Sequence, residues 1–496
     1  MVSGTEVSMR ITNQMMINNS MANIQINKNQ MNTMDTQFST QKKISKPSED
    51  PIIAIRALRL RSSLNQVEQY LGKNIPDASS WLQTTEGALD EANSILTDLY
   101  KYCTQGATDS YSSAERNTIV ESLNKLKEAY YAEGDVEYAG RYCFSGYMTD
   151  VPLNYQSDAA AKDADFTITQ KFTREDLSLK QSYTNAYSNE DILNMDVKKD
   201  ADGNVIAPNV QNVHRLRIAY NEVESDGNFK LKLSDGTEIN LAKTTDENYI
   251  PGADDAAFNP ETGEIYLGQN VYEQVYKADS CEFTYSKSNF KKGDQNPIMY
   301  FDCVDNSKNP PIAYEKKAED IEYNINFSQK LKVNTEANEA FNIYLGRDID
   351  DLITAVQNVI DVETQIEKVD EMLKQDQYAD SPSQEKLNLI KEGLTKQKEL
   401  AEEEMTKAFE KGVDQMQKYQ EQIALAKADA GNRDARLQLT KSRLTEQKAN
   451  FTKLKSENED VDLEEVVIGY SAAELVYNAS LTAASKVVQK TLLDFL

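Results

Sequence analysis

Residues 53–99 read IAIRALRLRSSLNQVEQYLGKNIPDASSWLQTTEGALDEANSILTDL, and this stretch decides the fold. Apolar or small side chains recur in it at steps of three and four residues, at Ile53, Ala57, Leu60, Leu64, Val67, Leu71, Ile75, Ala78, Leu82, Thr85, Leu89, Ala92, Leu96 and Leu99. Such steps are typical of an α-helical coiled-coil seam, here of about six heptads. Pro76 lies inside the pattern, so we expect a kink or a new helix there. The seam could be buried within one chain or between subunits.

The chain before this seam predicts another helix. Its apolar residues follow a similar spacing, at Ile17, Met21, Ile24, Met31, Met34 and Phe38. Residues 45–51 contain Pro47 and Pro51, and each proline disfavours helix at the residue before it. We therefore expect the first helix to end near residue 45. After the seam, a third helix is predicted over residues 113–133.

The last third of the chain also predicts long helices. Residues 348–377 and 384–429 have helical patterns on either side of a break at Ser381-Pro382. A final amphipathic stripe runs through Val466, Tyr470, Ala473, Tyr477, Leu481, Ala484, Val488, Leu492 and Phe495. Its eight steps span 29 residues, which is about 3.6 residues per step, the α-helical period.

The middle of the chain, residues 150–330, predicts β-structure. This stretch holds seven of the eleven prolines and seven of the nineteen glycines. Residues 228–233 and 238–241 alternate in polarity around Asp235-Gly236, which is a strong hairpin signal. Further short strands are predicted at residues 264–267, 281–285, 298–301 and 321–327.

Composition argues against most enzymes and against nucleic-acid binding. The chain has 81 acidic and 54 basic residues, a formal charge of −27, whereas phosphate binding depends on lysine and arginine. The same charge disfavours anionic membranes, and no apolar run approaches the roughly 18 residues of a membrane span. His214 is the only histidine, so a two-histidine metal site is impossible and His214 is interpreted as structural. We expect no catalytic residue, metal or cofactor.

The four cysteines and the single tryptophan are interpreted as structural. Cys281 and Cys303 flank predicted strands and could pair, although nothing in the spacing requires a disulfide. Cys103 and Cys143 are interpreted as small apolar residues, and Trp81 as a core or interface anchor.

The predicted fold class is α+β: an elongated rod whose long coiled-coil bundle is built from both termini, with a β-rich domain inserted. We divide the chain into a terminal assembly helix (1–45), the N-terminal part of the bundle (46–150), one or more β-rich outer domains (151–330), the C-terminal part of the bundle (331–460) and a second assembly helix (461–496). The apolar stripes of the two terminal helices are predicted to form the assembly interface with other subunits.

Several short motifs resemble the flagellin superfamily, and within it the hook-associated family of hook–filament junction proteins. They are MRITNQMM (9–16), KKISKPSEDP (42–51), GRYCFSGY (140–147) and TLLDFL (491–496). The resemblance covers residues 9–150 and 415–496 and leaves open whether translation starts at Met1 or Met9.

The resemblance implies a structural, non-enzymatic component of the bacterial flagellum that supports motility as an adaptor between hook and filament. It implies a homo-oligomeric ring, a hook-side contact with another hook-associated protein, a filament-side contact with flagellin, and a dedicated chaperone before type III export to the cell exterior. The alternative is a flagellin, the bulk filament subunit of the same superfamily. A protease-bearing flagellin is disfavoured because the chain has no H-E-x-x-H motif.

Overall fold

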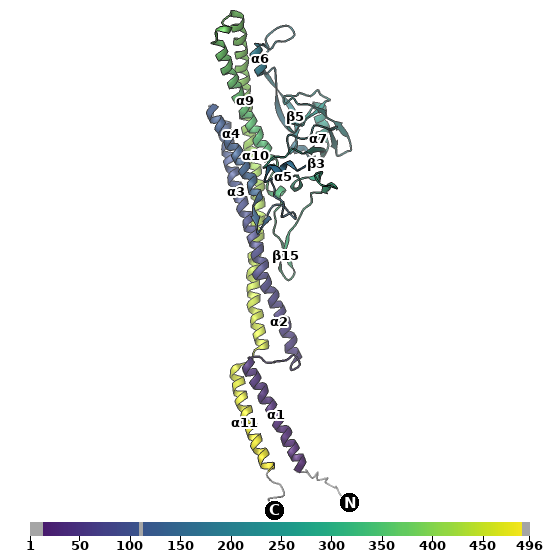
Figure 1. Cartoon of the computed structure of the whole chain (residues 1–496), viewed down its shortest axis with the longest axis vertical. Helices are drawn as coiled ribbons and strands as arrows, with labels where there is room; N and C mark the ends of the chain where they lie inside the picture. Colours follow the sequence, from purple (N-terminus) through teal and green to yellow (C-terminus); the bar gives the residue numbers. More distant parts are fainter. Residues whose placement is uncertain (1–12, 109–112, 489–496) are drawn as a thin grey trace, which may run out of the picture. The chain divides into compact units, whose positions relative to one another are not determined.

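The computed structural model describes residues 13–108 and 113–488, with long helices toward both ends and a β-rich region between them (Figure 1). The predicted α+β class is confirmed, whereas the rod shape stays a prediction. The chain divides into two compact units. Unit 1 consists of the chain up to Pro76, Asn324–Lys330 and the chain from Leu437 onward. Unit 2 consists of Asp77–Tyr323 and Leu331–Arg436.

Long helices supply most of unit 1 and the helical part of unit 2. The α-helices are α1 (Asn13–Thr40), α2 (Pro51–Gln69), α3 (Ile75–Thr108), α4 (Ser113–Ala132), α5 (Asp158–Lys162), α6 (Asn189–Asn194), α7 (Gln269–Lys277), α8 (Ala337–Ala340), α9 (Tyr344–Leu373), α10 (Ser381–Glu459) and α11 (Leu463–Val488). A π-helical segment, η1 (Tyr70–Asn74), joins α2 to α3. The irregular helix therefore lies just before Pro76, near the place where the sequence predicted a kink or a new helix. Short 3-10 turns are η2 (Glu133–Asp135), η3 (Arg174–Asp176), η4 (Pro297–Met299) and η5 (Asp376–Tyr378).

The strands form two larger sheets and two small hairpins. The strands are β1 (Glu137–Tyr138), β2 (Arg141–Tyr142), β3 (Phe166–Phe172), β4 (Ser178–Thr184), β5 (Asn209–Arg217), β6 (Lys230–Leu233), β7 (Glu238–Asn240), β8 (Ala242–Lys243), β9 (Ala256–Asn259), β10 (Glu264–Leu267), β11 (Cys281–Lys287), β12 (Asp302–Asp305), β13 (Ile312–Tyr314), β14 (Glu322–Asn326) and β15 (Gln329–Lys332). One sheet has the order β4-β5-β10-β9-β8, the other β13-β12-β3-β11-β6-β7, and β1-β2 and β14-β15 are hairpins.

Most residues of the predicted seam are buried inside the chain. Ala57, Leu64 and Val67 of α2 are buried in unit 1. In unit 2 the seam residues of α3 from Ala78 to Leu99 are buried, and Trp81 among them is fully buried. Burial within one chain therefore holds for these residues, whereas Ile53, Leu60 and Leu71 are half-buried, so both alternatives stay open for them.

The strand prediction is confirmed at four places and wrong at one. The Asp235-Gly236 turn joins β6 to β7. Residues 264–267 form β10, residues 281–285 belong to β11, and residues 321–327 contain β14. Residues 298–301 are not a strand, because η4 begins at Pro297 and the Asn296 side chain accepts a hydrogen bond from the Ile298 backbone N–H. A proline in the first turn and an asparagine cap both favour helical geometry.

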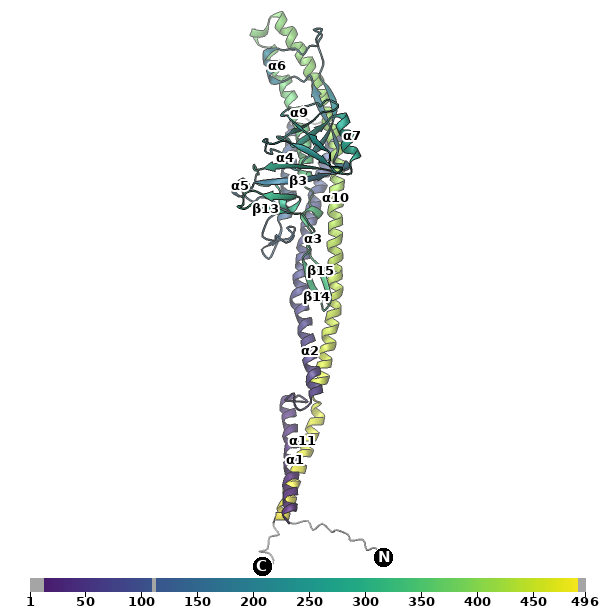
Figure 2. The same ribbon diagram turned by 90° about the vertical axis from the view of Figure 1, so that its right-hand side faces the viewer.

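The β-region has its own core on unit 2. Strands of both larger sheets contribute, with Ile168, Leu216, Phe258, Ile265 and Phe283 among the most buried side chains. Figure 2 shows these sheets beside α9 and α10. The sheets are therefore a packed domain with one side held against helices.

Gly106 of α3 packs closely against the Phe409 side chain of α10 in unit 2. A Cβ at Gly106 would lie 2.5 Å from Cγ of Phe409, whereas a Cβ at Gly87 on the same helix would meet nothing within 4 Å. We expect Gly106→Ala to lower the free energy of unfolding by about 1–3 kcal/mol through overpacking. Gly87→Ala should be neutral or stabilising, because alanine favours helix. Denaturant unfolding of both variants measures this, and equal stability of the two would contradict the packing.

Candidate assembly surface

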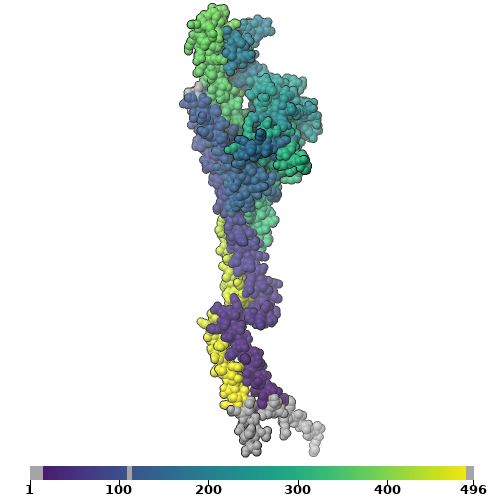
Figure 3. All heavy atoms as spheres, viewed as in Figure 1, coloured from purple at the N-terminus to yellow at the C-terminus, as the bar shows by residue number. Residues whose placement is uncertain are grey.

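The two terminal helices pair with each other in unit 1. Figures 1 and 3 show α1 and α11 side by side. The side-chain amide of Asn27 donates a hydrogen bond to Ser480 Oγ at 2.5 Å, and a Cβ at Gly469 would lie 3.4 Å from Met34 Sδ. The pairing therefore brings together the two stripes that the sequence analysis assigned to assembly.

Most of the predicted assembly residues lie in this seam. Val466 and Ala473 are buried, and Ile17, Ile24, Met31, Met34, Tyr470, Tyr477 and Ala484 are half-buried. Met21, Phe38 and Leu481 are exposed. Val488 ends α11, but its side chain lies outside the described part of the chain, as do Leu492 and Phe495. For all of the predicted assembly residues, contacts with other subunits stay a prediction.

A second apolar face lies on the opposite side of α11. Ile468 and Leu475 are 70% and 71% exposed, and Ala472 and Ala479 are exposed along the same line. Residues seven apart in a helix point in nearly the same direction, and each of this set is about half a turn from a seam residue. The seam thus leaves a stripe of apolar and small side chains open to solvent, the kind of surface that marks a protein–protein contact. Sequence reasoning missed it because the seam stripe was the stronger signal.

The motif KKISKPSEDP forms the joint between α1 and α2. Asp50 caps α2, since its side chain accepts from the backbone N–H groups of Ile52 and Ile53, and Pro51 takes the first helical position. The Lys43 N–H donates to the Glu459 carbonyl at 2.8 Å, and the Val461 N–H donates to the Gln41 carbonyl at 3.2 Å. Backbone hydrogen bonds therefore connect the segment after α1 to the segment between α10 and α11.

Ion pairs reinforce this joint. Arg61 donates two hydrogen bonds to the buried Glu459 carboxylate at 2.7 and 2.8 Å, and Lys42 pairs with Asp460. The hydrogen bond from Arg61 lowers the pKa of Glu459, and the hydrogen bond from Lys42 lowers the pKa of Asp460. The two helix breaks are thus held in one fixed arrangement.

The motif GRYCFSGY is a turn that packs in unit 2. Ala139 and Gly140 both have positive φ, at 52° and 74°, between β1 and β2, which suits a two-residue hairpin turn. The Arg141 guanidinium lies 4.8 Å from the Trp81 ring centroid. The buried ring of Phe144 meets Phe341 edge-on at 4.9 Å. Trp81 is a buried core residue, as predicted. Gly140, Arg141 and Phe144 of the motif GRYCFSGY serve the turn and its packing in unit 2.

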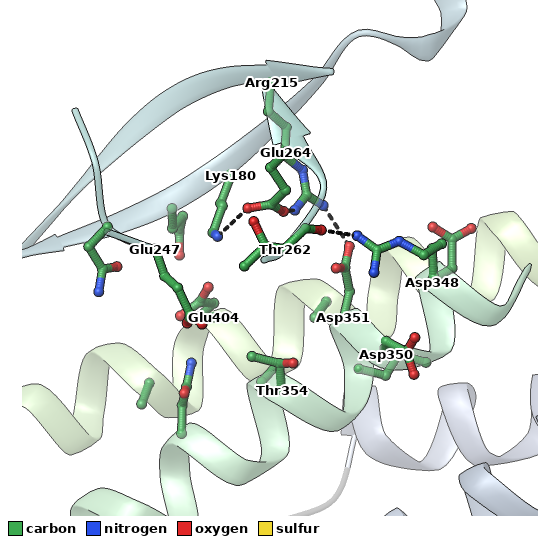
Figure 4. Close-up of a pocket in the computed structure, with 18 of the residues that line it drawn as sticks. Lys180, Arg215, Glu247, Thr262, Glu264, Asp348, Asp350, Asp351, Thr354 and Glu404 are labelled. Atoms are coloured by element: carbon green, nitrogen blue, oxygen red, sulfur yellow. Dashed lines mark hydrogen bonds and ion pairs between the residues drawn. The ribbon is translucent and has the colours of Figure 1, made fainter. Parts of the chain in front are cut away.

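A charged cleft of about 1000 Å³ lies in unit 2 between the β4-β5-β10 side of the sheet and helices α9 and α10 (Figure 4). Arg215 pairs with Glu264 and, at 2.5 Å, with Asp351. Lys180 reaches the second oxygen of Glu264 at 2.6 Å. Sheet and helices are therefore joined by side chains of opposite charge.

The same network continues along α9. Arg217 pairs with Asp348 and, at 2.6 Å, with Asp351, and the Tyr419 hydroxyl donates to Asp348. Despite burial, Arg215 and Lys180 lower the pKa of Glu264 to about 2, and Arg215 and Arg217 lower that of Asp351 further still. The sequence analysis missed this network. Its only signal was Arg215 and Arg217 two apart on one face of a strand, together with Asp348 and Asp351 at the start of the helix predicted over residues 348–377.

The remaining candidates carry structural roles. The His214 ring stacks on Tyr272 at 3.6 Å, and all four cysteines are free and buried. Cys281 and Cys303 lie on β11 and β12, which pair with opposite edges of β3, so a strand separates them. In residues 13–108 and 113–488 no group of three or more His, Cys, Asp or Glu is placed to hold a metal ion. None of the helices in those residues combines the length and apolar character of a membrane span.

Residues 11–149 match the family model described as the bacterial flagellin N-terminal helical region. A flagellin of Clostridium tyrobutyricum is 28% identical over 120 residues, 24% of this chain and 32% of the relative. Flagellar hook-associated protein 3 of Salmonella typhimurium is 24% identical over 165 residues, 33% of this chain and 51% of the relative. The matches span about half or less of the relatives' own length.

Two solved structures show a low overall similarity to this chain. The flagellar hook-associated protein 3 of Legionella pneumophila gives a TM-score of 0.31 at 12% identity, covering 80% of this chain and 97% of that one. The flagellar junction protein of Legionella pneumophila gives 0.30 at 12% identity, covering 82% and 100%. The predicted resemblance to the flagellin superfamily and its hook-associated branch is confirmed by the sequence matches.

Proposed function

We propose that this chain, which carries the N-terminal helical region of the flagellin superfamily, is a structural junction protein between the hook and the filament of the bacterial flagellum. The observation that carries the proposal is the paired α1–α11 seam with an exposed apolar stripe on its outer face. A subunit that must bind copies of itself needs such a surface, since burial of apolar area drives association. The protein acts by assembly alone, with no chemical turnover.

The partners follow from the same proposal. Copies of this chain form a ring through α1 and α11. One side of the ring meets the neighbouring hook-associated protein and the other meets flagellin. The ring lies outside the cell, and the chain reaches it through the flagellar type III system. The match to a hook-associated protein 3 over 165 residues supports this placement.

A bulk flagellin is the second candidate, favoured by the 28% identity to a flagellin. The number of copies per flagellum separates the two functions. Quantitative mass spectrometry of purified flagella should find this chain at a ring-sized copy number, far below flagellin. A copy number in the thousands would overturn the junction role and establish the flagellin alternative.

We also propose that a chaperone covers α11 before export. The helix exposes Ile468 and Leu475, and burying one side chain of this size is worth roughly 1.5–3 kcal/mol. Truncation after Glu464 should abolish chaperone binding and leave the β-region folded, as measured by pull-down and by circular dichroism. Chaperone binding that survives the truncation would show that the binding site lies elsewhere.

A further inference from the structure

The seam that decides the fold contains one irregular step. From Ile53 to Leu99 the steps alternate between three and four, except at Val67–Leu71–Ile75, where two steps of four follow each other. The π-helical segment η1 (Tyr70–Asn74) lies at this place, and the Ile75 N–H donates to the Tyr70 carbonyl five residues back. A π-turn takes up one extra residue, which matches the one extra residue in the spacing of the seam.

The sequence favours this π-turn over a regular α-helix. Extending the register of α3 backward without the extra residue would place Glu68 and Arg61 in the seam instead of Val67 and Leu60. Glu68 instead pairs with Lys448 at 3.2 Å, and Arg61 with Glu459. Both charges would lose these partners in the alternative register.

The same segment contains a glycine and is followed by a proline, two residues that disfavour a regular α-helix. Gly72 adds backbone freedom, and Pro76 has no N–H to donate to the preceding turn. A Cβ at Gly72 would meet nothing within 4 Å, so position 72 itself faces open space.

The tip of the β14–β15 hairpin contacts both ends of this segment, and tip and segment belong to unit 1. The Phe327 ring meets the Tyr70 ring edge-on at 5.7 Å. The Asn74 side-chain amide donates to the Asn324 carbonyl at 2.7 Å. These two contacts between hairpin tip and helix are weak, because Phe327 is 46% exposed and the hydrogen bond from Asn74 is open to water.

We propose that the tip of the β14–β15 hairpin is a releasable strap that sets the stiffness of the π-helical segment. With the strap in place, the first and last residues of η1 are held and the register of α2 is firm. With the strap released, the segment containing Gly72 and Pro76 opens locally while the rest of unit 1 keeps its packing. A subunit with such a strap can adjust one helix without unfolding.

Hydrogen–deuterium exchange of the full chain tests the strap. Phe327→Ala should make peptides covering residues 66–78 exchange roughly three- to tenfold faster, which corresponds to loss of one aromatic pair. Peptides from α11 and β3 should exchange as before. Ile312→Ala, which also trims an exposed apolar side chain, should leave residues 66–78 unchanged.

A second variant separates a strap from general destabilisation. Gly72→Ala fits without a clash and raises helix propensity, so in the Phe327→Ala background it should return exchange of residues 66–78 toward the wild-type rate. The proposal is overturned if Phe327→Ala leaves those peptides unchanged, if it accelerates exchange equally throughout the chain, or if Gly72→Ala fails to slow them.

Discussion

Replacing Ile468 and Leu475 by aspartate is expected to abolish incorporation of this chain into flagella. Both side chains lie on the exposed face of α11, opposite the seam with α1. In the assembled ring each new carboxylate would be buried against a neighbouring subunit, which costs several kcal/mol per charge. Cells with this variant should make hooks without filaments and release flagellin into the medium, as seen by electron microscopy and by immunoblotting of the medium.

The control for this variant is Leu193→Asp. Leu193 on α6 is also exposed, at 59%, but lies outside the proposed assembly surface. It should leave filaments unchanged. The purified Ile468→Asp/Leu475→Asp protein should keep wild-type circular dichroism, since its seam residues are intact. Normal filaments in cells with the double variant would rule out the outer face of α11 as the assembly surface.

Glu264→Gln is expected to give the largest loss of stability in unit 2. The Glu264 carboxylate is 5% exposed and accepts hydrogen bonds from both Arg215 and Lys180. Removing one partner of a buried charge network costs about 3–5 kcal/mol, because Lys180 loses its carboxylate partner and Arg215 keeps only Asp351. Denaturant unfolding at neutral pH measures the loss. Glu238→Gln, which breaks the exposed pair with Lys230, should leave the free energy of unfolding nearly unchanged.

The pH dependence of unfolding gives an independent check. The pKa of Glu264 is about 2 in the folded chain, below its ordinary value of 4.5. The carboxylate therefore contributes its full stability above pH 4.5, and this contribution is lost as the pH falls from 4.5 toward 2. Glu264→Gln should flatten the stability curve in that window. An unchanged slope would contradict the ion-pair geometry.

Local pattern was enough to predict the long helices. The three-and-four spacing placed α2, α3 and the terminal helices, because a buried apolar stripe at helical period has few other solutions. The Asp235-Gly236 turn placed β6 and β7 for a similar reason, since its conformation links neighbouring strands directly.

Features that depend on distant partners could not be predicted. The error at residues 298–301 was local instead, because IMYF is a short apolar run that resembles a buried strand, yet Asn296 and Pro297 start a 3-10 turn there. The charged network joins Arg215 to Asp351 across 136 positions, and no local spacing connects them. The same holds for the pairing of α1 with α11, which turns two separate stripes into one seam and leaves a different face of α11 exposed.

Imaging of isolated hook–filament complexes tests the junction role most directly. An epitope tag in the exposed loop at residues 201–203 would mark each copy with gold without touching α1 or α11. The proposed function predicts a single narrow band of gold where the hook meets the filament. Gold along the whole filament, or gold absent from the hook–filament boundary, would contradict it.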